Sequence, residues 1–100
     1  MKTTFKEEDN NYVMYFEGRL DTAAAPMVQV DVQPLIDSKG HDIILDCSNL
    51  DYISSSGLRI FLSILKSAKA ANQHVYIRSL NDSLRQVFTM TGFINLFEFK

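Results

Sequence analysis

The sequence predicts an α/β protein with a mixed sheet of four to five strands and helices mainly on one face, in the order β-β-α-β-α-β-α-β. Two short apolar runs, "DIILDCS" (42–48) and "HVYIRSL" (74–80), are typical of buried strands, and the helix-length segment 56–71 separates them. Strand, helix and strand in this order form a right-handed parallel crossover. A chain of 100 residues, 46% hydrophobic and 22% charged, is expected to fold as a single domain, 1–100.

The N-terminal segment predicts a β-hairpin. Two short strands are expected over residues 3–7 and 12–17, where aromatic and aliphatic residues alternate with polar ones. The polar run Asp9-Asn10-Asn11 between them predicts a tight turn. These strands form the antiparallel part of the mixed sheet.

The next segment, "LDTAAAPMVQVDVQPLIDSKG", predicts a helix with a break. Asp21 and Thr22 are candidate N-caps, and Lys39-Gly40 is a typical helix end. Pro34 removes a backbone N–H inside the segment, so it should bend or interrupt the helix. Three valines in alternate positions leave a strand as the alternative.

The helix predicted over 56–71 is mostly buried. At 100° per residue, its apolar side chains cover more than half of the helix surface, and they include Leu58, Phe61, Leu62, Leu65 and Ala68. The remaining narrow polar strip is formed by Arg59, Ser63, Lys66 and Ser67. One thin face of this helix is therefore available to a partner.

A third helix and a last strand complete the fold. Asn81 is a typical N-cap and Gly92 a typical terminator for the helix in "LNDSLRQVFTMTGF". The final segment, "INLFEFK", mixes apolar and polar residues and predicts a short strand over 94–100.

Charge and composition exclude several functional classes. The net charge is -2, the isoelectric point is about 5.5, and no cluster of lysines and arginines occurs, so nucleic acid is not an expected partner. No signal peptide or membrane-spanning segment is recognisable, so we expect a cytoplasmic protein that does not insert into membranes. Cys47 is the single cysteine, and we expect an inert strand residue without a disulfide or a cysteine metal cluster.

Serine nucleophile chemistry is not expected. A nucleophilic serine needs a base within hydrogen-bond reach, and His41 and His74 both stand at the start of predicted strands. The serines 54–56 follow the far end of the first of these strands, about 16 Å away over five residues. We therefore interpret both histidines as ordinary surface residues.

No cofactor is predicted, because the glycine-rich phosphate-binding loops of nucleotide enzymes are absent. Asp21, Asp46 and Ser48 could gather near the serine loop, which makes a weak signal for a metal site. A small nucleotide-binding or hydrolysing enzyme using Asp21 and Asp46 is the remote alternative. For Asp21 the competing interpretation is helix capping, and for Asp46 a contact at the strand end.

Three serines, Ser54, Ser55 and Ser56, precede the buried helix, although one hydroxyl is enough for a cap. We expect Ser55 or Ser56 to be that cap. A helix N-terminus stabilises negative charge, so a phosphate on a hydroxyl in this turn would be well accommodated. Arg59 and Lys66, further along the polar strip, could meet an acidic partner surface that such a phosphate would affect.

The stretch "IILDCSNLDYISSSGLRIFL" resembles the core motif of the STAS domain, in which a strand and a short loop deliver a phosphorylatable serine to a helix N-terminus. "FEGRLDTAAAP" is similar to the segment after the first hairpin of that family, and "LRQVFTMTGF" to its third helix. The resemblance spans nearly the whole chain and implies a STAS-like sandwich. The usual loop of the family, D-S-S-G-L, places the phosphoacceptor on Ser55, with Ser56 and Ser54 as alternatives, and an adjacent aspartate on Asp21. Ser54 stands where the family has an acid, and the family's usual C-terminal helix has no counterpart before Lys100.

This resemblance implies an anti-sigma factor antagonist that acts by partner switching. The unphosphorylated protein would bind an anti-sigma factor that is itself a serine kinase, phosphorylation of Ser55 would end binding, and a PP2C-type phosphatase would restore it. The protein would be a substrate and a binding module, not an enzyme. The alternative is a STAS subunit of a membrane transport or lipid-trafficking complex that docks on an ATPase. The expected partner-binding residues are Asp21, Ser54, Ser55, Ser56, Gly57, Arg59, Ser63 and Lys66.

Overall fold

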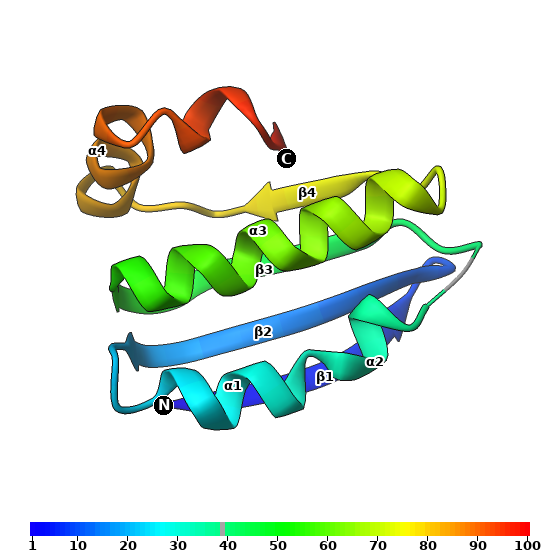
Figure 1. The fold of residues 1–100 in the computed structure, drawn as a ribbon, viewed down its shortest axis with the longest axis horizontal. Coiled ribbons are helices and arrows are strands. Elements are labelled where there is room, and N and C mark those ends of the chain that lie inside the picture. Colours follow the sequence, from blue (N-terminus) through cyan, green and yellow to red (C-terminus); the bar gives the residue numbers. More distant parts are fainter. Residues whose placement is uncertain (39) are drawn as a thin grey trace.

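The computed structural model describes residues 1–38 and 40–100, and within them it contains one mixed sheet in the strand order β1-β2-β3-β4-β5 (Figure 1). The strands are β1 (Lys2–Glu8), β2 (Asn11–Leu20), β3 (Ile43–Ile53), β4 (Val75–Arg78) and β5 (Glu98–Phe99). The helices are α1 (Ala25–Asp31), α2 (Gln33–Ile36), α3 (Ser55–Ala70), α4 (Asp82–Met90) and the 3-10 turn η1 (Phe93–Asn95). β1 and β2 are antiparallel and the other neighbours are parallel. The predicted α/β class is confirmed.

The N-terminal hairpin is confirmed, with longer strands than predicted. β1 and β2 pair along the whole of β1 and are joined by a two-residue turn. Asp9 and Asn10 both have positive φ, 50° and 67°, the backbone geometry that matches the twist of a hairpin. Asn11 belongs to β2 and is not part of the turn.

The predicted helix after β2 is interrupted where Pro34 was expected to interrupt it. α1 ends and α2 begins at Val32, and Pro34 occupies the first turn of α2, where its missing N–H leaves no bond unmade. Val28 and Val32 are buried while Val30 is 72% exposed, which is helical spacing, so the alternative strand is excluded. Of the predicted helix end, Lys39 lies outside the described residues, and Gly40 follows α2 in a bend.

The parallel crossover is confirmed as β3, α3 and β4, but the first strand was predicted too short. β3 does not end at residue 48; it continues through the polar stretch to Ile53. The reason is its neighbour, because β2 extends to Leu20 and pairs with β3 as far as the Leu20–Ile53 pair. Conversely, β4 ends at Arg78, before Ser79, which has a positive φ of 62°.

The last segment differs from the prediction. Asn81 caps α4 through its side-chain oxygen, which accepts the Leu84 N–H at 2.8 Å, and Gly92 ends the helix with a φ of 80°. The chain then forms the turn η1 instead of a strand from residue 94, so β5 has only two residues. The turn that follows the left-handed Gly92 therefore includes residues that the apolar pattern had assigned to the strand.

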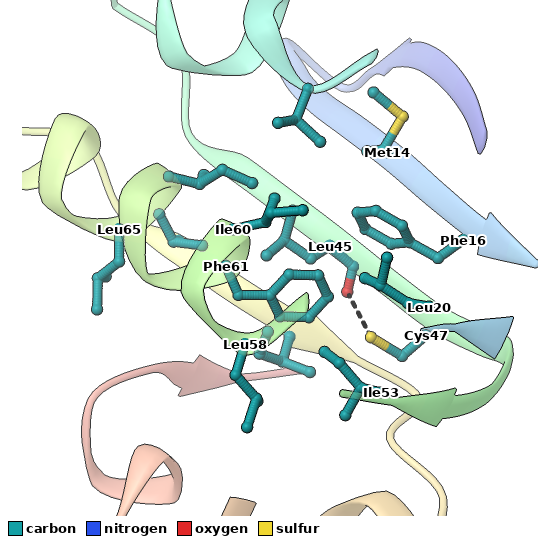
Figure 2. Close-up of a cluster of buried hydrophobic side chains, with 14 of the residues drawn as sticks. Met14, Phe16, Leu20, Leu45, Cys47, Ile53, Leu58, Ile60, Phe61 and Leu65 are labelled. Atoms are coloured by element: carbon teal, nitrogen blue, oxygen red, sulfur yellow. Dashed lines mark hydrogen bonds between the residues drawn. The ribbon is translucent and has the colours of Figure 1, made fainter. Parts of the chain in front are cut away.

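The main core lies between the sheet and the helices, and α1, α2 and α3 run across one face of the sheet (Figure 1). Phe61 of α3 packs on Phe16 of β2 with ring centroids 5.1 Å apart (Figure 2). Cys47 is fully buried in the same cluster, and burial raises the pKa of its thiol to about 12, with the charge of Asp46 adding to the effect. Cys47 is therefore a buried strand residue, as predicted. None of the described helices combines the length and apolar character needed to cross a bilayer.

Candidate functional site

The serine loop is fixed to the end of the sheet. β3 ends at Ile53, and the next backbone N–H, that of Ser54, donates to the carbonyl of Leu20 at 2.8 Å. The end of β2, the beginning of α3 and the segment leading into α1 therefore meet at one edge of the molecule (Figure 1). Asp21, the residue after Leu20, thus lies beside the serine loop, as the sequence predicted.

Ser54 is the N-cap of α3, which corrects the prediction that Ser55 or Ser56 would be. Its backbone is extended, and its side-chain oxygen accepts the Gly57 N–H at 3.2 Å while its carbonyl accepts the Leu58 N–H at 2.9 Å. Ser54 is buried, with 8% of its surface exposed. Serine and aspartate are about equally good N-caps, so Ser54 does the structural work that an acidic residue would do at this position.

Gly57 is required for the close approach of α3 to the sheet. A Cβ atom at this position would lie 2.7 Å from Leu20 Cγ and 2.8 Å from Ile53 Cγ1, both closer than real Cβ atoms come. Gly57 is buried, so it supports the loop from beneath and does not form part of its outer surface.

Ser55 is the exposed serine of the three. It is the first residue of α3, where backbone N–H groups have no acceptor within the helix. Ser56, the next residue, is half-buried. A negative charge on the Ser55 hydroxyl would therefore lie in solvent, at the positive end of a sixteen-residue helix.

A shallow groove of about 390 Å³ lies between α1 and α3, and Ser56 is one of its lining residues. Its lining residues come from the turn before α1 and from the first two turns of both helices, and they are Thr22, Ala25, Pro26, Gln29, Ser56, Arg59 and Ile60. Sequence reasoning missed Pro26 and Gln29, since only the packing of α1 against α3 shows that they face the same space. Ser56 and Arg59 are three residues apart on one helix, so they are neighbours on its surface, and this spacing could have indicated their side of the groove.

The predicted polar strip of α3 is confirmed, and its members differ in role. Arg59 and Lys66 are exposed, and no carboxylate within the described part of the chain lies within ion-pair distance of either. Ser63 is half-buried and returns its hydroxyl to the Ile60 carbonyl at 2.7 Å. Ser67 donates to the Ile36 carbonyl at 2.8 Å, so it ties α3 to α2. The strip therefore presents two unneutralised positive charges.

Asp21 closes the turn that leads into α1. Its Oδ1 accepts the Ala24 N–H at 2.9 Å and its carbonyl accepts the Ala25 N–H at 3.1 Å, which is the bonding of an N-cap. Asp21 therefore caps the turn over residues 22–24 and not α1 itself, whose N-cap is Ala24 without a side-chain hydrogen bond, so the prediction of Asp21 or Thr22 as the helix N-cap is wrong. Thr22, the other candidate cap, is exposed and lines the groove instead.

Asp46 does not join the serine loop, and the predicted grouping with Asp21 and Ser48 is wrong. It lies within β3, seven residues before Ile53, which is roughly 23 Å of strand. Its carboxylate is buried and accepts hydrogen bonds from Arg78 Nε at 2.7 Å and from the Ser48 amide at 3.0 Å. Asp46 therefore ties β3 to β4. Within the described residues, no three His, Cys, Asp or Glu side chains are placed to hold a metal ion.

The pKa of the Asp46 carboxyl lies below its usual range. Burial alone would raise the pKa, but hydrogen bonds from the Ser48 hydroxyl and amide and from the Arg78 guanidinium outweigh burial. Arg78 also donates to the Tyr15 hydroxyl, which in turn bonds Glu8, so the network spans β1 to β4. This network lies on the face of the sheet away from the main core and binds its strands together.

The histidines lie away from the serines, as predicted. His41 precedes β3, stacks on Tyr12 with ring centroids 4.2 Å apart, and is hydrogen-bonded to the Asn10 carbonyl. His74 precedes β4, is exposed and pairs with Glu98 at 2.7 Å. Both stand at the strand ends opposite the serine loop, so neither can act as a base for Ser55.

Comparison with known proteins agrees with this geometry. The family described as the STAS domain matches residues 2–100. The chain is 29% identical over 97 residues to BtrV of Bordetella bronchiseptica, provisionally named an anti-sigma factor antagonist, covering 97% of this chain and 84% of the relative. It is 27% identical over 89 residues to an anti-sigma-B factor antagonist of Staphylococcus aureus, covering 89% and 82% of the two chains.

Solved structures share the fold. An anti-sigma factor antagonist (STAS) domain protein from Planctomyces limnophilus superposes with a TM-score of 0.88 at 13% identity, over 98% of this chain and 87% of that one. The phosphorylated form of SpoIIAA from Bacillus superposes with a TM-score of 0.74 at 18% identity, over 99% and 91%. At these sequence identities the structural similarity shows a shared fold and nothing more. Because the family match covers residues 2–100, the chain belongs to the STAS domain family.

Proposed function

We propose that this protein is an anti-sigma factor antagonist whose binding is switched by phosphorylation of Ser55. One observation carries the proposal: Ser54 caps α3, so Ser55 is left exposed at the first position of that helix, with its hydroxyl available to a kinase. The names of the relatives from Bordetella and Staphylococcus support the class of partner.

The switch acts through charge. A phosphoserine carries about -1.5 to -2 charges near neutral pH, and at a helix N-terminus that charge favours the helix. The fold of the loop should therefore persist, and the change falls on the surface around it. Arg59 and Lys66 carry positive charges that suit an acidic partner, and a phosphate on Ser55, one helical turn before Arg59, repels that same partner.

The partners follow from this mechanism. The anti-sigma factor is itself the serine kinase that modifies Ser55, and a PP2C-type phosphatase reverses the modification, both in the cytoplasm. The protein acts as substrate and binding module and catalyses nothing. Asp21, Ser56, Ser63 and the groove between α1 and α3 complete the docking surface, while Ser54 and Gly57 hold it in place.

The test is phosphorylation by the anti-sigma kinase encoded in the same genome. The purified protein is incubated with that kinase and ATP, and intact mass and peptide mapping locate the modification. We expect one phosphate on Ser55, none in Ser55→Ala, and one in the matched control Ser56→Ala. The kinase should form a complex with the unmodified protein in the presence of ADP. This complex should be lost after phosphorylation. Absence of both a phosphate on Ser55 and a complex would reject the proposal.

A further inference from the structure

β1 is an edge strand, because its one neighbour in the sheet is β2. Seven residues long and continuously paired on its inner side, it presents an outer edge that no other described segment covers. We propose that two copies of this protein pair through this edge, β1 against β1 in antiparallel orientation, with Phe5 on the two-fold axis.

The hairpin determines which backbone groups point outward. In a two-residue hairpin the residues flanking the turn, Glu8 and Asn11, form a hydrogen-bonded pair, and bonded pairs then alternate along the strands. The N–H of Tyr12 agrees with this alternation, because it donates away from β1, to the Asp42 carbonyl at 2.9 Å. The even-numbered residues of β1 thus bond β2. The N–H and C=O groups of Thr3, Phe5 and Glu7 point outward and can bond a second copy.

Charge selects one register among those that this geometry allows. With Phe5 opposite its own copy, Lys2 of each chain lies opposite Glu8 of the other, which gives two Lys–Glu pairs per dimer. Glu8 already accepts the Tyr15 hydroxyl and lies 3.8 Å from Arg78, so in the dimer Lys2 joins that pairing as a second cation. Moving the two-fold axis from Phe5 to Thr4 shifts the pairing by two residues and places Lys2 opposite Lys6, and moving the axis to Lys6 places Lys6 opposite Lys6. Both shifts set like charges face to face, so the Phe5-centred register is the complementary one.

Apolar surface gathers at the same edge. Phe5 is 42% exposed although its ring packs edge-on against Tyr12, and a copy across the two-fold axis would bring a second Phe5 onto it. Met27 of α1 is 50% exposed, one helical turn before Asp31, whose carboxylate accepts a hydrogen bond from Thr3 of β1 at 2.8 Å. Met27 therefore lies on the side of α1 that borders β1 and adds to the apolar surface that pairing would cover.

Charged residues on an edge strand can also keep it monomeric, so the two readings of β1 must be separated by experiment. Charge complementarity distinguishes a dimerising edge from a protective one. Charges that only repel another copy do not need to match in any register. The dimer also leaves the proposed switch free, since Ser55 begins the helix after β3, two strands away from the edge. Pairing through β1 and phosphorylation of Ser55 can therefore be tested independently of each other.

The experiment is sedimentation equilibrium of the full chain, at concentrations up to about 1 mM because a pairing of this size need not be tight. We expect the wild type to approach twice its 11.4 kDa mass as concentration rises. Phe5→Pro removes an outward N–H that β2 does not use and should remain monomeric. Lys2→Glu should also be monomeric, because it sets two glutamates opposite each other, and so should Glu8→Lys, which sets two lysines opposite each other.

Mixing the two charge variants is the decisive step. In a heterodimer of Lys2→Glu with Glu8→Lys, both cross-strand pairs become Lys–Glu again, so the mixture should dimerise although neither variant does alone. This result does not depend on Phe5→Pro remaining folded. A wild type that stays monomeric at the highest concentration overturns the proposal, as does a dimer indifferent to Lys2→Glu, or a mixture of the two variants that stays monomeric.

Discussion

The Ser54 hydroxyl oxygen accepts the Gly57 N–H beneath the surface, at 3.2 Å, so the serine that caps α3 is not the serine that solvent reaches. Ser54→Ala should therefore lower the free energy of unfolding by about 1 kcal/mol, the usual value of an N-cap. Ser54→Asp should keep the cap and match or exceed the wild type, because an acid is favourable at a helix N-terminus. Urea denaturation measures both. Ser55→Ala is the matched control and should stay within about 0.5 kcal/mol; an equal loss there would place the cap on the wrong residue.

Gly57→Ala should destabilise the protein, although alanine is the better helix former by about 1 kcal/mol. The new methyl group would meet Leu20 and Ile53 at less than 3 Å, and overpacking of this kind costs about 1–3 kcal/mol. Leu20→Ala opens the space that the methyl group needs, so the double variant should be more stable than the sum of the single effects implies. Strict additivity in urea denaturation would show that the contact with Leu20 is not the cause.

Acid should weaken the fold partly through Asp46. Its folded pKa is depressed, so its contribution is present above the ordinary aspartate pKa of about 3.9 and is lost as pH falls through the lower folded pKa. Asp46→Asn should therefore lower stability near pH 7 and flatten the dependence of stability on pH below about 4. The measurement is thermal unfolding across pH 2–7 in steps of about half a unit. Asp51→Asn changes an exposed carboxylate and is the control; an identical pH profile for both variants would contradict the role of Asp46.

The sequence predicted the order of elements well because each signal was local: a short polar run between two strands, an N-capping Asn81, a proline inside a helix. The end of β3 is not local. The residues from Ser48 to Tyr52, which are mostly polar apart from the buried Leu50, show no clear strand pattern, and they are extended because β2 runs beside them to Leu20. The same pairing determines the cap of α3. The three adjacent serines are chemically alike, and Ser54 is the cap because β3 ends at Ile53, the residue before it. Family resemblance predicted Ser55 as the phosphoacceptor, and the packing shows that Ser54 is buried while Ser55 is exposed.

His74 should titrate above an ordinary histidine. The hydrogen bond and the charge of Glu98 raise its pKa, so the pairing contributes stability below the ordinary pKa of about 6.5, which is lost as pH rises through the raised value. Glu98→Gln keeps the shape of the side chain and removes its charge, and it should move the His74 midpoint downward in an NMR titration of the imidazole. An unchanged midpoint would show that β5 does not hold Glu98 against His74 in solution.

Binding of the anti-sigma factor should depend on charge at two positions one helical turn apart. Ser55→Asp places a fixed negative charge at the first position of α3 and should weaken the complex at least tenfold, whereas Ser55→Ala should bind like the wild type and continue to bind after kinase and ATP are added. Arg59→Glu should weaken binding without any phosphate, because it reverses an exposed charge that no carboxylate in the described structure neutralises. Lys69→Glu, on the last turn of the same helix and far from the serine loop, is the matched control for net charge.

Titration calorimetry compares the four variants. Equal losses for Arg59→Glu and Lys69→Glu would mean that the partner senses only total charge, while a loss confined to Arg59 and Ser55 places the docking surface at the beginning of α3.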